Sequence, residues 1–257
     1  MEVTLEFLTG LAKEAGQILL DGLDDVHTLD YKGPTNIVTE IDKKAEDFIV
    51  GKIKQSFPEH TIIAEESGKT QGNKGKNWYI DPVDGTSNYA RGLPFFSVSI
   101  GFEENGLMQF GCVYDPVRDE SFSAERGKGA WLNSKKIRVS KTNRLIDAML
   151  VTGFPYNLEQ ENNNLGHFSE IIKEVHVVRR LGSAALDQVY VAAGRLDAYW
   201  EIGVESWDIA AGTLIIEEAG GKITTLDGSD KYMVPPYAIL ASNGILHESL
   251  LAFFINN

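Results

Sequence analysis

The sequence predicts a mixed α/β protein, one compact body in which β-sheets alternate with pairs of helices. In the first half, successive strands are separated by short turns, as in an antiparallel meander. In the second half, shorter strands alternate with helices in a more parallel-looking pattern. No repeat, low-complexity tract or linker divides the 257 residues. We therefore expect a single domain, residues 1–257, with two sublayers at approximately 1–145 and 146–257.

Two amphipathic helices are expected at the start of the chain. The apolar residues of the first recur at helical spacing between Leu8 and Leu19. The second spans residues 45–56, and Pro58 stops it because proline cannot continue a helix. The TEID sequence at residues 39–42 resembles a capping box, with Asp42 in place of the usual Glu.

The later elements are predicted from short apolar runs, from alternation and from helical periodicity. Strands are expected at residues 61–64, 78–80, 96–102, 108–114, 121–124, 148–152, 177–180, 198–201, 222–225 and 239–242, with a hairpin at 127–134. Helices are expected at residues 168–173, 186–193 and 209–219, and from about Leu246 onward. Residues 67–77 are rich in Gly, Lys and polar side chains, which predicts a flexible loop.

The composition excludes several functional classes. A formal net charge of -13 argues against general binding to nucleic acid or to anionic membranes, both of which need basic patches. An anionic substrate would then need a local attraction, which bound cations supply. The single cysteine, Cys112, cannot form an internal disulfide. With no basic signal-peptide start and no apolar run long enough to span a bilayer, we expect a cytoplasmic protein.

The stretch DPVDG at residues 81–85 is the strongest candidate for chemistry. It follows an apolar run, and its proline and glycine predict a sharp turn. Asp81 and Asp84 held together on this turn repel each other unless a cation lies between them. Carboxylates are hard oxygen ligands of the kind that Mg²⁺ prefers. Residues 86–88 could open a helix whose first N–H groups face a phosphate.

Each acidic position also has a simpler interpretation. Asp-Pro and Asp-Gly are common in surface turns. Glu65 and Glu66 end a predicted strand, and because neighbouring strand residues point to opposite faces, only one can enter a site. Asp208 stands at a predicted helix start, where an aspartate often serves only as a cap.

Several segments in order resemble the inositol monophosphatase family, which comprises lithium-sensitive, magnesium-dependent phosphomonoesterases. In the first half these segments are NIVTEID (36–42), AEES (64–67) and WYIDPVDGTSNY (78–89). In the second half they are GSAA (182–185), WDIAAG (207–212) and EAGG (218–221). The resemblance covers nearly the whole chain. It implies a layered αβαβα sandwich of the sugar-phosphatase type, a homodimer, and two to three Mg²⁺ ions.

The resemblance also implies a role for individual residues. One Mg²⁺ would be held by Glu65, Asp81 and the Val83 carbonyl, a second by Asp81, Asp84 and Asp208, and a third by Glu65 through water. Thr86, hydrogen-bonded toward Asp42, would orient the attacking water, and the N–H groups of Gly85 and Thr86 would hold the phosphate. The substrate hydroxyls would be bound by Glu201, Asp84 and the Ala184 backbone.

The sequence therefore predicts Mg²⁺-dependent hydrolysis of a sugar or polyol monophosphate, with myo-inositol 1-phosphate as the leading substrate. Fructose 1,6-bisphosphate, histidinol phosphate, NADP and 3′-phosphoadenosine nucleotides remain open as alternatives in the same family. A regulatory binding protein that keeps the fold without depending on catalysis is the alternative from another class, because fold alone does not fix function.

Overall fold

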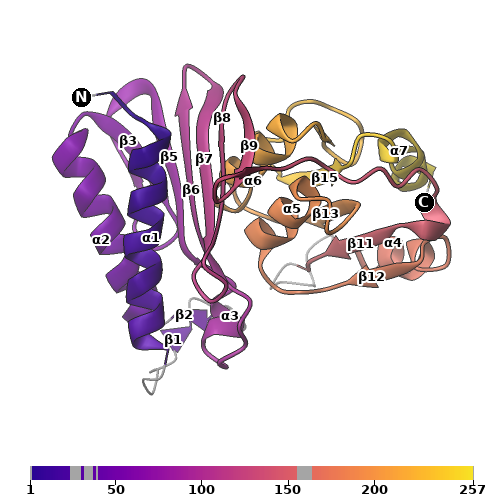
Figure 1. Ribbon diagram of the computed structural model, residues 1–257, viewed down its shortest axis with the longest axis horizontal. Helices are drawn as coiled ribbons and strands as arrows, with labels where there is room; N and C mark the ends of the chain where they lie inside the picture. Colours follow the sequence, from indigo (N-terminus) through magenta and orange to yellow (C-terminus); the bar gives the residue numbers. More distant parts are fainter. Residues whose placement is uncertain (1, 24–29, 32–36, 39, 155–163, 257) are drawn as a thin grey trace.

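Two β-sheets alternate with three layers of helices in the computed structural model, which describes residues 2–23, 30–31, 37–38, 40–154 and 164–256. Figure 1 shows the order of the layers: α1 and α2, a large sheet, α5 and α6, a smaller sheet, and finally α4 and α7. This is the αβαβα sandwich expected from the sequence. None of the helices in the described ranges is long and apolar enough to cross a bilayer.

The first sheet has eight strands in the order β10-β9-β8-β7-β6-β5-β3-β4. The bounds of its strands are β3 (His60–Ala64), β4 (Gly68–Thr70), β5 (Asn73–Asp84), β6 (Ser97–Glu104), β7 (Leu107–Asp115), β8 (Glu120–Glu125), β9 (Gly129–Leu132) and β10 (Lys135–Lys136). All its pairings are antiparallel except that of β3 with β5. The expected meander and the hairpin near residues 127–134 are confirmed.

The second sheet has five strands in the order β12-β11-β13-β15-β14. Its strands are β11 (Met149–Thr152), β12 (Val177–Arg179), β13 (Ala198–Ile202), β14 (Lys222–Thr224) and β15 (Ala238–Ser242). β11 pairs in parallel with β12 and β13, and β15 pairs antiparallel with β13 and β14. A further two-stranded ribbon pairs β1 (Asp30–Tyr31) with β2 (Ile37–Val38).

The helices lie close to their expected positions. They are α1 (Leu5–Gly22), α2 (Glu40–Ser56), α3 (Thr86–Tyr89), α4 (Asn164–Ile171), α5 (Ala184–Ala192), α6 (Ser206–Glu218) and α7 (His247–Asn256), with a short 3-10 helix at Leu145–Asp147. Thr4 caps α1 by accepting a hydrogen bond from the N–H of Phe7 at 3.2 Å. Thr39 of the expected capping box lies outside the described residues, as do residues 159–163 of the polar loop that the sequence predicts at 159–164.

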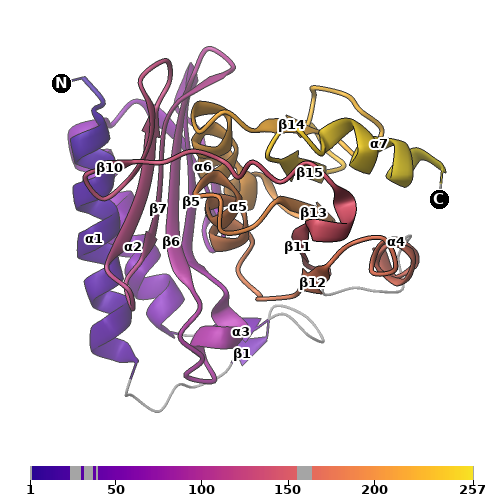
Figure 2. The same cartoon turned by 45° about the vertical axis from the view of Figure 1, so that its right-hand side comes forward.

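Three apolar cores hold the layers together. One lies between α1, α2 and the first sheet and contains Leu8, Ile49 and Trp78, all fully buried. The central core surrounds α5 and α6, which Figure 2 shows between the two sheets. Because α6 meets apolar neighbours on several sides, every one of its residues from Ile209 to Ile216 is buried. The third core packs α4 and α7 on the second sheet.

Two local expectations are wrong. The predicted loop at residues 67–77 contains β4 and the start of β5. β4 lies at the edge of the sheet, where polar and charged residues are common, so its composition resembles that of a loop. The predicted sharp turn after Ile80 is instead a continuation of β5 to Asp84, with a register shift between Asp81 and Asp84 in its pairing with β6.

Candidate active site

A cavity of about 340 Å³ lies where the end of β5 meets the starts of α5 and α6. Of the residues expected in the site, it is lined by Glu65, Asp81, Val83, Asp84, Gly85, Thr86, Ala184, Glu201 and Asp208. Asp42 lies behind Thr86 rather than on the wall. Residues from both halves of the chain are therefore brought to one place.

The irregularity in β5 explains how Asp81 and Asp84 reach the same cavity. Residues three apart on a regular strand point to opposite faces, but a bulge adds a residue and resets the alternation. Pro82, which has no N–H to donate, lies within the irregular stretch. The N–H of Val83 donates to Asp81 Oδ1 at 3.0 Å and so fixes that carboxylate. Both aspartates are buried and both line the cavity.

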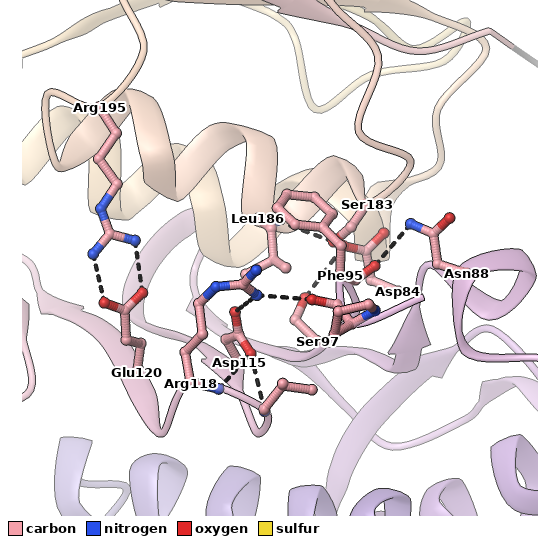
Figure 3. Close-up of polar contacts among 12 residues, drawn as sticks. Asp84, Asn88, Phe95, Ser97, Asp115, Arg118, Glu120, Ser183, Leu186 and Arg195 are labelled. Carbon is pink, nitrogen blue, oxygen red and sulfur yellow. Dashed lines mark hydrogen bonds and ion pairs between the residues drawn. The ribbon is translucent and has the colours of Figure 1, made fainter. Parts of the chain in front are cut away.

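Asp84 is held by the N-terminus of α5. Its Oδ1 accepts the N–H of Ala184 at 2.9 Å, and its Oδ2 accepts the N–H of Ala185 at 2.9 Å. Ser183 and Ser97 also donate their hydroxyl protons to Oδ2, as Figure 3 shows. The first N–H groups of a helix have no partner within the helix, so a carboxylate is stabilised there. The Ala184 amide, expected to contact substrate, is thus already engaged with Asp84.

Thr86 opens α3 and connects the acidic stretch to α2. Its Oγ1 lies 3.0 Å from Asp42 Oδ1 and 3.0 Å from the Val83 carbonyl oxygen. A hydroxyl has a single proton, so these two acceptors compete for it. Gly85, just before, has φ of +97°, which strongly favours glycine, and a Cβ there would lie 3.1 Å from the carbonyl oxygens of Gly182 and Phe95.

Only one of Glu65 and Glu66 enters the cavity, as expected, but strand alternation is not the reason, because both residues lie beyond the end of β3. Glu65 lines the cavity and its carboxyl group is hydrogen-bonded to Asp81. Glu66 does not line the cavity, and its backbone N–H donates to Glu46 instead. Both residues lie in the turn that follows β3.

Asp208 both caps the start of α6 and lines the cavity. It is the third helical residue rather than the N-cap, which is Glu205. Its Oδ2 accepts the N–H of Glu205 at 2.7 Å, as in a capping box. The cap and the position on the cavity wall are therefore compatible, and the simpler interpretation of Asp208 does not exclude the functional one.

Glu201 lies on β13 at another wall of the cavity. The hydroxyl of Tyr199 donates to its Oε2 at 2.8 Å. Burial raises the pKa of Glu201 to about 7, although the Tyr199 hydrogen bond opposes this shift. Its carboxylate lies against Gly153, where any Cβ would collide with both carboxylate oxygens. Gly153 therefore leaves the space that Glu201 occupies.

Crowding of negative charge is the main electrostatic feature of the cavity. Burial, followed by the charges of Glu65, Asp84 and Asp208, raises the pKa of Asp81 well above its ordinary value. Burial likewise raises the pKa of Asp84, against the opposing effect of its hydrogen bonds. It also raises the pKa of Asp208 well above its ordinary value, and nearby carboxylates add to the shift.

These residues fit a hard divalent cation by their chemistry. Carboxylate and carbonyl oxygens are the donors that Mg²⁺ takes, and a cation would relieve the repulsion that raises these pKa values. Within the described ranges, no three His, Cys, Asp or Glu side chains form a ready-made metal centre. The fit therefore rests on the kind and crowding of the donors.

Sequence reasoning missed several residues around the cavity. Ser97 and Ser183 fix Asp84 but are separated from it by 13 and 99 positions. Asp187 also lines the cavity and is buried, and its Oδ1 accepts no hydrogen bond from any residue that the structure describes. Its position in the first turn of α5, two residues after the GSAA segment, is the one signal that could have identified it.

Comparison with known proteins identifies the family of the chain. Residues 1–255 match the inositol monophosphatase family. The chain belongs to this family. It is 42% identical over 255 residues to "Nus factor SuhB" of Pasteurella multocida, covering 97% of this chain and 95% of that protein. It is 39% identical over 251 residues to "Inositol-1-monophosphatase" of Mesorhizobium japonicum, covering 96% and 94%.

A solved structure supports the same assignment of the fold. The inositol monophosphatase of Anabaena (Nostoc) sp. PCC 7120 superposes with a TM-score of 0.87 at 41% identity, over 98% of this chain and 95% of that one. The family is of the phosphatase type and its members generally use Mg²⁺. Of the two relatives of the chain named above, one has the name of an enzyme and the other does not.

Proposed function

We propose that the protein is a Mg²⁺-dependent phosphomonoesterase that hydrolyses a sugar or polyol phosphate, with myo-inositol 1-phosphate as its leading substrate. One observation carries the proposal: the carboxylates of Asp81, Asp84, Asp208 and Glu65 share a cavity with a threonine hydroxyl hydrogen-bonded to a buried aspartate. Phosphoryl transfer needs mainly positioning and charge neutralisation, and this arrangement can supply both.

The carboxylates would act as metal ligands. Glu65, Asp81 and the Val83 carbonyl would hold one Mg²⁺, and Asp81, Asp84 and Asp208 a second. A third would be bound by Glu65 through water. Because Asp84 Oδ2 already accepts three hydrogen bonds, its Oδ1 is the oxygen better placed for an ion. Bound Mg²⁺ would lower the pKa of a water molecule and neutralise charge on the phosphate.

Thr86 and Asp42 would orient the attacking water. If the Val83 carbonyl oxygen is engaged by an ion, the Thr86 proton is left to Asp42, which accepts it at 3.0 Å. The lone pairs of Oγ1 then remain available to accept a hydrogen bond from the water and so align it. The N–H groups of Gly85 and Thr86, at the start of α3, would hold the phosphate oxygens.

Glu201 would select the alcohol part of the substrate. A carboxylate can accept hydrogen bonds from two neighbouring hydroxyl groups, which suits a polyol ring. Tyr199 occupies one side of Oε2 and holds the group in place. Fructose 1,6-bisphosphate, histidinol phosphate, NADP and 3′-phosphoadenosine 5′-phosphate remain alternatives because they share the phosphate end and differ in what Glu201 would contact.

The direct test is phosphate release from these five esters, with and without Mg²⁺. We expect Mg²⁺-dependent release, fastest from inositol 1-phosphate. Faster release from another ester would keep the reaction and replace the substrate. No release from any ester by folded protein in excess Mg²⁺ would refute the proposal. Lithium should inhibit at millimolar concentration, and insensitivity would indicate a different third-ion site.

A regulatory role is the second candidate, favoured by the name "Nus factor SuhB" of the Pasteurella multocida relative. The name does not define a partner for this chain. If a catalytically inactive variant restored normal growth to a deletion strain that grows poorly, it would establish a role independent of catalysis. We also propose a homodimer, which light scattering after size-exclusion chromatography would detect.

A further inference from the structure

Glu46 is a buried acidic residue to which neither the sequence nor the proposed mechanism gives a function. It lies on α2 and is only 2% exposed. Its Oε2 accepts the N–H of Glu66 and its Oε1 accepts the N–H of Ser67, each at 2.7 Å. Two successive backbone N–H groups facing one carboxylate form a small anion-binding concavity. Hydrogen bonds to a carboxylate are short and strong, so this contact holds the turn firmly.

The turn held by Glu46 begins with Glu65. The N–H of Glu65 itself donates to the carbonyl oxygen of Ile80 at 3.1 Å. The backbone of Glu65 is therefore fixed on one side by β5 and on the other by α2. With the backbone fixed, the direction of its Cα–Cβ bond is set, and its carboxyl group meets Asp81 at the cavity wall.

The same helix supports a second part of the site. Asp42 lies four residues before Glu46, so the two carboxylates share one face of α2. Asp42 is also buried, and it accepts the hydroxyl proton of Thr86. One face of α2 thus contacts both the segment that carries Thr86 and the segment that carries Glu65.

We propose that Glu46 is a positioning residue for Glu65: its carboxylate holds the turn at residues 65–67 in the conformation that directs Glu65 toward the metal ligands. This inference rests on the proposed function of Glu65 as a metal ligand. A purely structural role, in which Glu46 only satisfies two amides, predicts a loss of stability without a loss of metal affinity.

The test is direct metal binding to the Glu46→Gln variant, measured by titration calorimetry with Mg²⁺ or Mn²⁺ and no substrate. Glutamine keeps the size of the side chain but replaces one accepting oxygen with an NH₂ group, which repels an amide N–H. Loss of an outer-shell partner typically weakens metal affinity about 10–100-fold, and we expect a loss in this range. The control is Asp47→Asn, which removes the same charge from the exposed face of α2 and should bind metal as the wild type does.

Two further variants keep the test decisive. Glu46→Asp retains the charge and both oxygens but shortens the side chain, so it should show a smaller loss and carries the test if Glu46→Gln does not fold. In a double-mutant cycle with Glu65→Gln, the two losses of metal affinity should not add, because Glu46 acts through Glu65. Additive losses would overturn the inference.

The inference would also be overturned if Glu46→Gln bound the metal ion with an affinity within about twofold of the wild type, even if its melting temperature fell. The loss of an outer-shell partner typically lowers metal affinity about 10-fold or more. The proposed function fails separately: metal binding by the wild type without phosphate release would refute catalysis and leave the positioning of Glu65 measurable.

Discussion

Replacing Glu201 with glutamine should stabilise the metal-free protein at alkaline pH. Burial raises the pKa of Glu201 from 4.5 to about 7. At about 1.4 kcal/mol for each pKa unit, this shift corresponds to roughly 3 kcal/mol. Because the pKa is higher in the folded state, the ionised form is the one that folding penalises. Glutamine is neutral at every pH and can still accept the hydrogen bond from Tyr199.

The sign of the pH dependence follows from linkage. The stability that neutral Glu201 contributes is fully present below its unfolded pKa of 4.5 and is lost as the pH rises through about 7. The variant should therefore exceed the wild type by up to about 3 kcal/mol at alkaline pH and by little near about pH 5. The loss of the Glu201 charge also eases ionisation of Asp187 and Asp208, which acts in the same direction.

The assay is urea unfolding with a chelator present, at about pH 5 and again at about pH 8.5. The difference in free energy of unfolding between the variant and the wild type should appear at the higher pH. The matched control is Glu174→Gln, at an exposed position in the loop after α4. It should change stability equally at both pH values. An equal free energy of unfolding for the wild type and Glu201→Gln at alkaline pH would refute the reasoning, because Glu201 would then be ionised without penalty.

Three other predictions concern catalysis. Asp208→Asn keeps an oxygen to cap α6, so phosphate release should fall by at least about 100-fold while the melting temperature is maintained; persistent activity would disprove the metal assignment. Glu65→Gln should abolish turnover and Glu66→Gln should barely change it, since only the first lines the cavity; equal losses would contradict the assignment of Glu65 as the metal ligand of this turn. Gly153→Ala would displace the Glu201 carboxylate, so KM should rise at least about tenfold with a smaller change in kcat; an unchanged KM would exclude Glu201 from substrate binding.

The residues predicted from sequence are those with a local signal. The pair Asp81 and Asp84 lies in one short segment with proline and glycine, and both aspartates line the cavity as expected. The conformation that brings them there was missed, because a bulge depends on the pairing of β5 with β6 rather than on the segment itself. A sharp turn and a bulged strand have the same local composition.

The residues that support the site had no such signal. Ser97 and Glu46 are ordinary residues in a strand and a helix, and their partners are set by packing between elements. The sequence predicts a loop in place of the edge strand β4 because an edge position tolerates the polar residues of a loop. Tertiary contacts therefore account for most of what sequence reasoning could not supply.

The hydrogen bonds between the N-terminus of α5 and Asp84 have a consequence for how the two halves of the chain assemble. The carboxylate is on the first sheet, and three of its four donors lie at the N-terminus of α5, about a hundred positions later, while the fourth is Ser97 of β6. Asn88 makes a second bridge, donating to the carbonyl oxygen of Leu181 at 2.9 Å. Neither half can complete the cavity alone. A chain cut near residues 145–147 should be inactive as separate fragments and regain turnover only when they reassociate, so catalysis would report the docking of the two sheets.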